Sequence, residues 1–135
     1  MTAMLAEKIS DLEHQTWRAL QHNGSALLPF LSRDCVMQFP LGLKVSATSD
    51  PSLKDIMLSD AFIPWLGYAL EDVAVSELGK EAALITYRAV ALRPPLLEGE
   101  ENVEFHALCA SVWRLDAEAE TWLMCFHQQT AFEVE

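Results

Sequence analysis

Two stretches at the end of the sequence decide the fold: residues 103–115, VEFHALCASVWRL, and residues 121–132, TWLMCFHQQTAF. Each indicates one long strand, and the short segment from Asp116 to Glu120 joins them. Two earlier stretches have the same character: residues 68–78 and residues 82–93. The second half of the chain therefore predicts four strands longer than the usual length of roughly five to six residues, as a strongly bent sheet requires.

The first half of the chain favours helices instead. Three segments are predicted to be helical: residues 2–22, 26–31 and 51–59. Apolar side chains recur every three to four positions in the first segment, while its charged residues, Glu13 among them, are expected on the opposite face. Asp50 is expected to cap the third helix, with Pro51 at its first position. A short strand is predicted at residues 35–39.

Helices followed by long antiparallel strands form an α+β order rather than a βαβ alternation. No repeat, low-complexity run or long linker divides the chain. We therefore predict a single domain over residues 1–135, in which a bent antiparallel sheet of about six strands wraps around three helices of the N-terminal half.

The chain is strongly acidic, with 20 acidic against 9 basic residues and a formal net charge of -11. This charge argues against binding to nucleic acids and to anionic membranes. The start of the chain lacks a signal peptide's apolar run, and no apolar stretch reaches the roughly 18 to 20 residues that span a bilayer. Cys35, Cys109 and Cys125 form no pairing motif. Reduced thiols are expected, which predicts a cytoplasmic protein.

Five short motifs appear in an order typical of one known group: WRAL at 17–20, DCVM at 34–37, YRA at 87–89, ASVW at 110–113, and Trp122 followed by HQQT at 127–130. Over its whole length the chain resembles the SnoaL-like, uncharacterised branch of the nuclear transport factor 2-like superfamily. The closing Trp-x4-His-Gln-Gln-Thr stretch is the most specific part. Ala131 is a departure, because such sequences often have proline there.

This resemblance implies a cone-shaped, bent antiparallel sheet with helices over its concave face. It also implies a pocket at the mouth of the cone and a homodimer formed through the outer face of the sheet. The superfamily hosts isomerases, dehydratases, cyclases, epoxide hydrolases and plain interaction modules. Fold alone therefore does not give the function.

His127 is the first candidate for chemistry, because an imidazole can move a proton near neutral pH. The alternative is a structural histidine whose ring is hydrogen-bonded inside the sheet. Alternation along the last strand puts His127 and Gln129 on the face opposite to Trp122 and Met124. One bulge would exchange these faces, so the sequence leaves open whether Gln128 or Gln129 faces the pocket.

Two further residues are candidates for a catalytic role. Asp34 is the obvious carboxylate, since the enzymes that the chain resembles pair an acid with a histidine or tyrosine, but aspartate also favours turns. Tyr87 can donate a hydrogen bond to a ligand carbonyl, or pack as a half-buried aromatic residue.

The ligand-binding candidates combine aromatic walls with polar contacts. Arg88 can bind a ligand carboxylate or form a salt bridge at an edge or interface. Seven residues are expected to bind the ligand: Trp17, Phe39, Phe62, Trp65, Arg88, Trp113 and Gln129. Ordinary core packing remains the alternative for each aromatic residue.

No metal site is predicted, because the sequence lacks HxxxH, HExxH and cysteine-pair motifs. No cofactor is expected either, since no glycine-rich phosphate loop is present. Two functions remain. One is a homodimeric pocket protein that binds a hydrophobic small molecule. The other is a cofactor-free acid–base enzyme acting on a small apolar substrate.

Overall fold

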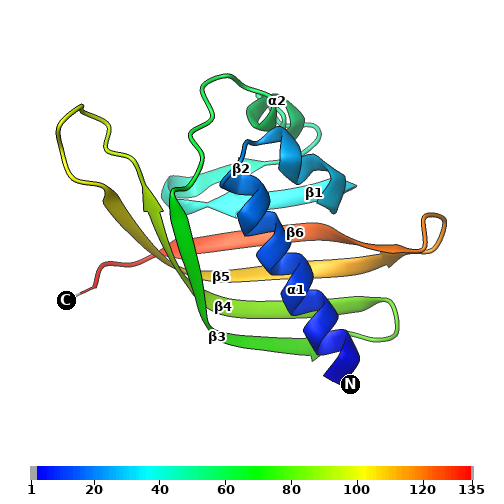
Figure 1. The fold of residues 1–135 in the computed structure, drawn as a ribbon. Coiled ribbons are helices and arrows are strands. Elements are labelled where there is room, and N and C mark those ends of the chain that lie inside the picture. Colours follow the sequence, from blue (N-terminus) through cyan, green and yellow to red (C-terminus); the bar gives the residue numbers. More distant parts are fainter. Residues whose placement is uncertain (1–2, 135) are drawn as a thin grey trace.

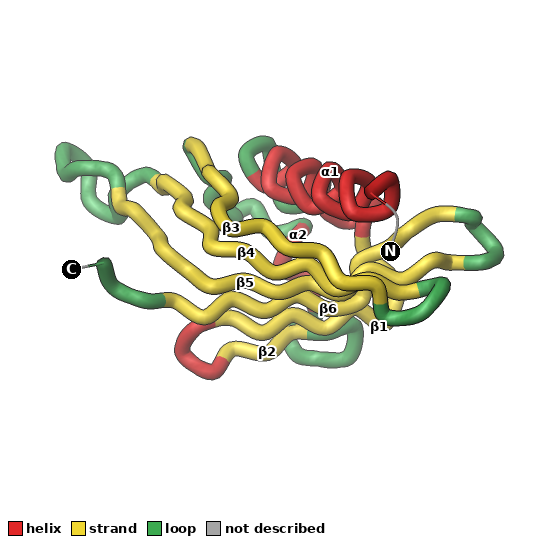
Figure 2. Tube along the Cα trace, turned by 90° about the horizontal axis from the view of Figure 1, so that it is seen from below, coloured by secondary structure: helices red, strands yellow, loops and turns green. Residues whose placement is uncertain are grey.

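A computed structural model describes residues 3–134 and has the predicted α+β architecture. Six strands form one sheet in the order β2-β1-β6-β5-β4-β3, and α1 lies across it on one side (Figures 1 and 2). The elements are α1 (Ala3–Leu20), the 3-10 turn η1 (Ser25–Phe30), β1 (Leu31–Phe39), the turn η2 (Pro40–Gly42), β2 (Leu43–Val45), α2 (Leu53–Met57), β3 (Gly67–Glu77), β4 (Ala82–Arg93), β5 (Val103–Asp116) and β6 (Thr121–Ala131). The expected helix start at Thr2 lies outside the described residues.

The four late strands pair antiparallel in sequence order, as predicted. The pairing of β1 with β6 differs, because these two strands run parallel and make the sheet mixed. Adjacent strands in the sequence can turn back on each other, whereas β1 and β6 are joined only through all the elements between them. Between residues 3 and 134, no helix is long and apolar enough to cross a membrane.

The helix α1 packs its apolar stripe against the sheet, as its periodicity predicts, and Ile9 and Trp17 are buried. Glu13 corrects the sequence interpretation, because its side chain is fully buried rather than exposed to solvent. It lies four residues after Ile9 and four before Trp17, so the 3.6-residue helical repeat places it on the apolar stripe.

The start of α2 is a second correction. Ser52 is the N-cap, not Asp50, and its hydroxyl accepts a hydrogen bond from the Asp55 backbone N–H at 3.1 Å. The Asp55 carboxylate accepts in return from the Ser52 backbone N–H at 3.4 Å. This reciprocal capping box satisfies two backbone donors, which a cap at Asp50 would not. The helix therefore begins after Pro51.

A bulge in β6 decides which side chains face the helices. Val112 pairs with Phe126 and Trp113 pairs with Met124, so Cys125 is an extra residue in β6. Trp122 and Met124 before the bulge are buried, and so is His127 after it. Simple alternation, which separates these residues between two faces, is therefore wrong along this strand.

Candidate functional site

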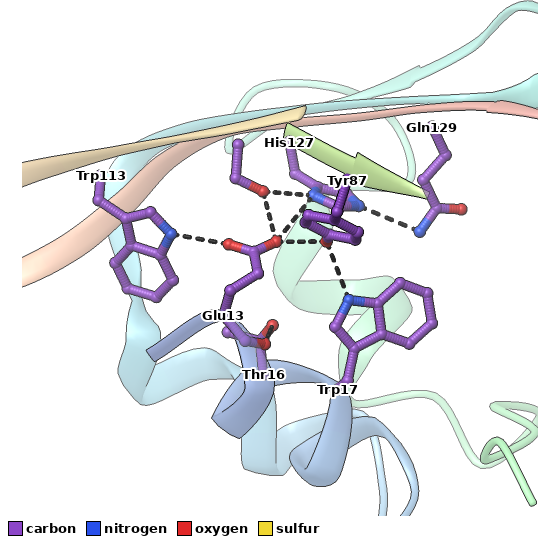
Figure 3. Close-up of polar contacts among 8 residues, drawn as sticks. Glu13, Thr16, Trp17, Tyr87, Trp113, His127 and Gln129 are labelled. Atoms are coloured by element: carbon purple, nitrogen blue, oxygen red, sulfur yellow. Dashed lines mark hydrogen bonds and ion pairs between the residues drawn. The ribbon is translucent and has the colours of Figure 1, made fainter. Parts of the chain in front are cut away.

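Three donors from β4 and β5 converge on the carboxylate of Glu13, which α1 directs toward the sheet (Figure 3). The Tyr87 hydroxyl donates to Oε2 at 2.5 Å, the Ser111 hydroxyl donates to the same oxygen at 2.7 Å, and the Trp113 indole donates to Oε1 at 2.7 Å. Burial raises the pKa of Glu13, while the three hydrogen bonds from Tyr87, Ser111 and Trp113 act in the opposite direction.

His127 continues this network from β6. Its Nδ1 lies 2.7 Å from the Ser111 Oγ and 3.7 Å from the Glu13 carboxylate, and its Nε2 lies 3.0 Å from the Gln129 amide nitrogen (Figure 3). Burial lowers the pKa of His127 to about 4. The imidazole is therefore neutral at pH 7 and keeps one unprotonated ring nitrogen.

A small apolar cavity lies beside His127. Its volume is about 40 Å³ and its wall includes Trp17, Met37, Phe39, His127 and Gln129. Trp17 is fixed there by a hydrogen bond from its indole N–H to the Tyr87 hydroxyl at 2.9 Å. A volume of this size holds a few waters or a very small molecule. A larger ligand requires the wall to move.

The structure brings together six residues that the sequence analysis named for the site. They are Trp17, Phe39, Tyr87, Trp113, His127 and Gln129. His127 thus lies with Tyr87 in one buried network, next to an apolar cavity with aromatic walls. The carboxylate of this network is Glu13 and not Asp34.

The candidate carboxylate Asp34 and the ligand-binding candidate Arg88 lie elsewhere. The Asp34 side chain is 66% exposed and pairs with Arg114 at 2.7 Å. Its pKa is lowered by hydrogen bonds from Ser32 and Arg114, as expected for a surface ion pair. Arg88 is exposed on the outer face of the sheet, where its guanidinium lies 5.0 Å from the ring centre of Phe132.

Two aromatic residues pack near the site without lining the cavity. Trp65 stacks on Phe105 with ring centres 5.6 Å apart and lies 5.9 Å from Trp17. Phe62 is partly buried against the hydrophobic core. Trp65 therefore supports the aromatic packing around Trp17 from outside the cavity.

Sequence reasoning missed Glu13 and Ser111 as site residues. The spacing of Glu13 from Ile9 and Trp17 indicates that Glu13 lies on the apolar stripe of the helix. A charged residue in such a stripe needs buried hydrogen-bond partners. Ser111 is buried on the same strand face as Trp113, but a serine in an apolar strand carries no specific signal. Within residues 3–134, no group of three histidine, cysteine or acidic side chains is placed to hold a metal ion.

We expect His127 to make stability depend on pH. The unfolded chain protonates this imidazole below its ordinary pKa of 6.5, whereas the folded chain does so only near 4. The unfolded state therefore binds more protons between these values, and the free energy of unfolding falls as the pH falls. The loss from this group is about 3 kcal/mol across the window.

Urea denaturation of the wild type and of His127→Asn at several pH values measures this effect. Asparagine does not titrate, so the stability difference between the two proteins should shrink by that amount from pH 7 to pH 4. A constant difference across the range would show that His127 titrates alike in both states.

Comparisons with known proteins agree with the architecture. No protein-family model matches the sequence, and no curated protein does so. Among solved structures, an NTF2-like protein from Cytophaga hutchinsonii is similar with a TM-score of 0.73 and 17% identity, over 98% of this chain and 100% of that one. The CaMKII hub of S. rosetta is similar with a TM-score of 0.74 and 16% identity, over 98% of this chain and 100% of that one.

A third similar structure is the hexachlorocyclohexane dehydrochlorinase LinA-type3 from Novosphingobium barchaimii. It has a TM-score of 0.73 and 12% identity, over 96% of this chain and 89% of that one. Identities this low show a shared fold and nothing more specific. The resemblance found in the sequence motifs is thus confirmed at the level of the fold.

Proposed function

The chain has the nuclear transport factor 2-like fold, and from this premise we propose that it is a homodimeric protein that binds a small molecule in the cavity beside His127. One observation carries the proposal. The buried chain of hydrogen bonds from Glu13 through Ser111 and His127 ends in an apolar cavity, where Gln129 contacts the last nitrogen. Apolar walls with a few convergent polar groups are typical of small-molecule sites.

A pair of neighbouring glutamines provides the test. Gln129→Ala removes the amide that occupies the His127 Nε2 and enlarges the cavity. We expect small uncharged compounds to bind this variant about tenfold more tightly than the wild type, which corresponds to about 1.4 kcal/mol. Tryptophan fluorescence and ¹H–¹⁵N NMR report binding, because Trp17 lines the cavity.

Gln128→Ala is the matched control. Gln128 donates a hydrogen bond to Thr130 and does not line the cavity beside His127. Its replacement should leave affinity at the wild-type value. If no compound in a broad screen of small uncharged molecules produces a saturable signal with any of the three proteins, the binding function is refuted.

Dimerisation is the second part of the proposal, and an apolar row on the outer face of the sheet supports it. Val36, Phe126, Val112 and Leu84 are neighbours on four adjacent strands. Most of their sequence neighbours are buried, Cys35, Met37, Ala83 and Ile85 among them, so strand alternation puts this partly exposed row on the opposite face of the sheet. A second copy of the chain would cover it. The similarity to the CaMKII hub of S. rosetta adds support.

An acid–base enzyme is the second candidate function. It is favoured by the carboxylate–serine–imidazole chain, since a neutral imidazole backed by a carboxylate can accept a proton. The similarity to a dehydrochlorinase points in the same direction. A bound compound that is chemically converted by the wild type, and not by a folded His127→Ala variant, would favour this candidate over simple binding.

A further inference from the structure

The Ser111 hydroxyl occupies the central position in the network. It is fully buried, and its Oγ lies 2.7 Å from both the Glu13 carboxylate and the His127 Nδ1. A hydroxyl has a single proton to donate. Ser111 therefore donates to one neighbour and must accept from the other.

The neighbours of Glu13 decide the direction. The Trp113 indole can only donate, and the Tyr87 hydroxyl already accepts from Trp17, so the proton of Tyr87 goes to Glu13. Both oxygens of the Glu13 side chain thus act as acceptors, and Ser111 is a further donor to Oε2. The Ser111 oxygen is then left to accept the N–H of His127 at Nδ1.

The opposite nitrogen of His127 is consequently a hydrogen-bond acceptor. With the ring proton on Nδ1, Nε2 presents a lone pair, and the Gln129 amide N–H donates to it at 3.0 Å. Two other titratable groups interact with Glu13: Tyr87 on β4 and Cys109 on β5. Burial raises the pKa of Tyr87 well above its usual value and that of Cys109 to about 12. Both are neutral at pH 8.

We propose that Ser111 determines the ligand specificity of this site: it fixes the His127 tautomer, so the cavity selects a small uncharged molecule that donates a hydrogen bond to Nε2 in place of Gln129. The ligand part rests on the proposed function, whereas the tautomer does not. A carboxylate ligand has no proton to donate, so its oxygen and Nε2 would be two hydrogen-bond acceptors facing each other. Its negative charge would also lie close to the Glu13 carboxylate. None of the described residues that line the cavity is a lysine or arginine that would neutralise the charge of such a ligand.

The tautomer is tested by the nitrogen chemical shifts of His127 at pH 8. We expect protonated Nδ1 and unprotonated Nε2 in the wild type and in Ser111→Thr, which keeps a hydroxyl. In Ser111→Ala both nitrogen shifts of His127 should move toward the values of a mixture of the two tautomers. The resonances of the other residues should show that the fold of this variant is intact. A wild type protonated at Nε2 would overturn the inference, and so would a Ser111→Ala variant that keeps the wild-type shifts.

The ligand class is tested in Gln129→Ala with acetamide, acetone and acetate, which have nearly the same shape. The atoms that this substitution deletes are those of acetamide. We expect acetamide to shift the Trp17 and His127 resonances saturably, at least tenfold more tightly than acetone or acetate. Adding Ser111→Ala should abolish that preference.

Equal binding of all three compounds, or a preference for acetate, would overturn the assigned specificity. Saturable binding of none would refute both the ligand class and the proposed binding site. In that case the tautomer would still be judged by the nitrogen shifts alone, so the two failures are distinguishable.

Discussion

Replacing Glu13 with alanine is expected to lower the free energy of unfolding by about 4 kcal/mol, because it leaves buried hydrogen-bond donors without an acceptor. The Tyr87 hydroxyl and the Trp113 indole both donate to this carboxylate from the sheet. The substitution also leaves a cavity between α1 and the sheet. Urea denaturation at a fixed protein concentration measures the loss.

Glu7→Ala is the matched control, since Glu7 is exposed on the same helix. It should change stability by about 0.5 kcal/mol or less. Glu13→Gln should fall between the two, because the amide keeps one acceptor oxygen but turns an N–H toward the remaining donors. A Glu13→Ala protein as stable as the Glu7→Ala protein would mean that the network contributes nothing to folding.

Replacing Val112 with glutamate is expected to convert a dimer into a monomer. Val112 lies in the centre of the apolar row, between Leu84 on β4 and Phe126 on β6. In a symmetric dimer the substitution buries two unpaired carboxylates at once. We expect dissociation to become at least about a hundredfold more favourable, which corresponds to roughly 2.8 kcal/mol.

Light scattering at micromolar concentration gives the result directly. The wild type should have about twice the 15.1 kDa mass of the chain, and Val112→Glu should have the mass of a single chain. Leu96→Glu is the control, because Leu96 is 83% exposed in the loop between β4 and β5, outside the sheet. A wild type that is monomeric, or a dimer unaffected by Val112→Glu, would refute the outer face as the interface.

The site was only partly accessible to sequence reasoning. His127 was predicted because histidine has a distinctive chemistry, and the aromatic residues were predicted because aromatic walls suit a hydrophobic small molecule. Asp34 was chosen as the carboxylate since it was the most visible acid near a strand. The structure instead pairs it with Arg114 at the surface and places Glu13 in the network.

Local patterns determined the elements of this protein. The 3.6-residue repeat in α1 and the length of β4, β5 and β6 follow from interactions between residues close in the sequence, so one chain was enough to predict the α+β class. Tertiary structure alone decided the parallel pairing of β1 with β6, the bulge at Cys125 and the burial of Glu13. The parallel pairing and the burial of Glu13 depend on partners far away in the chain, and the bulge depends on the pairing of β6 with β5. Glu13 can be buried only because Tyr87 and Trp113, on β4 and β5, supply the hydrogen bonds that replace water.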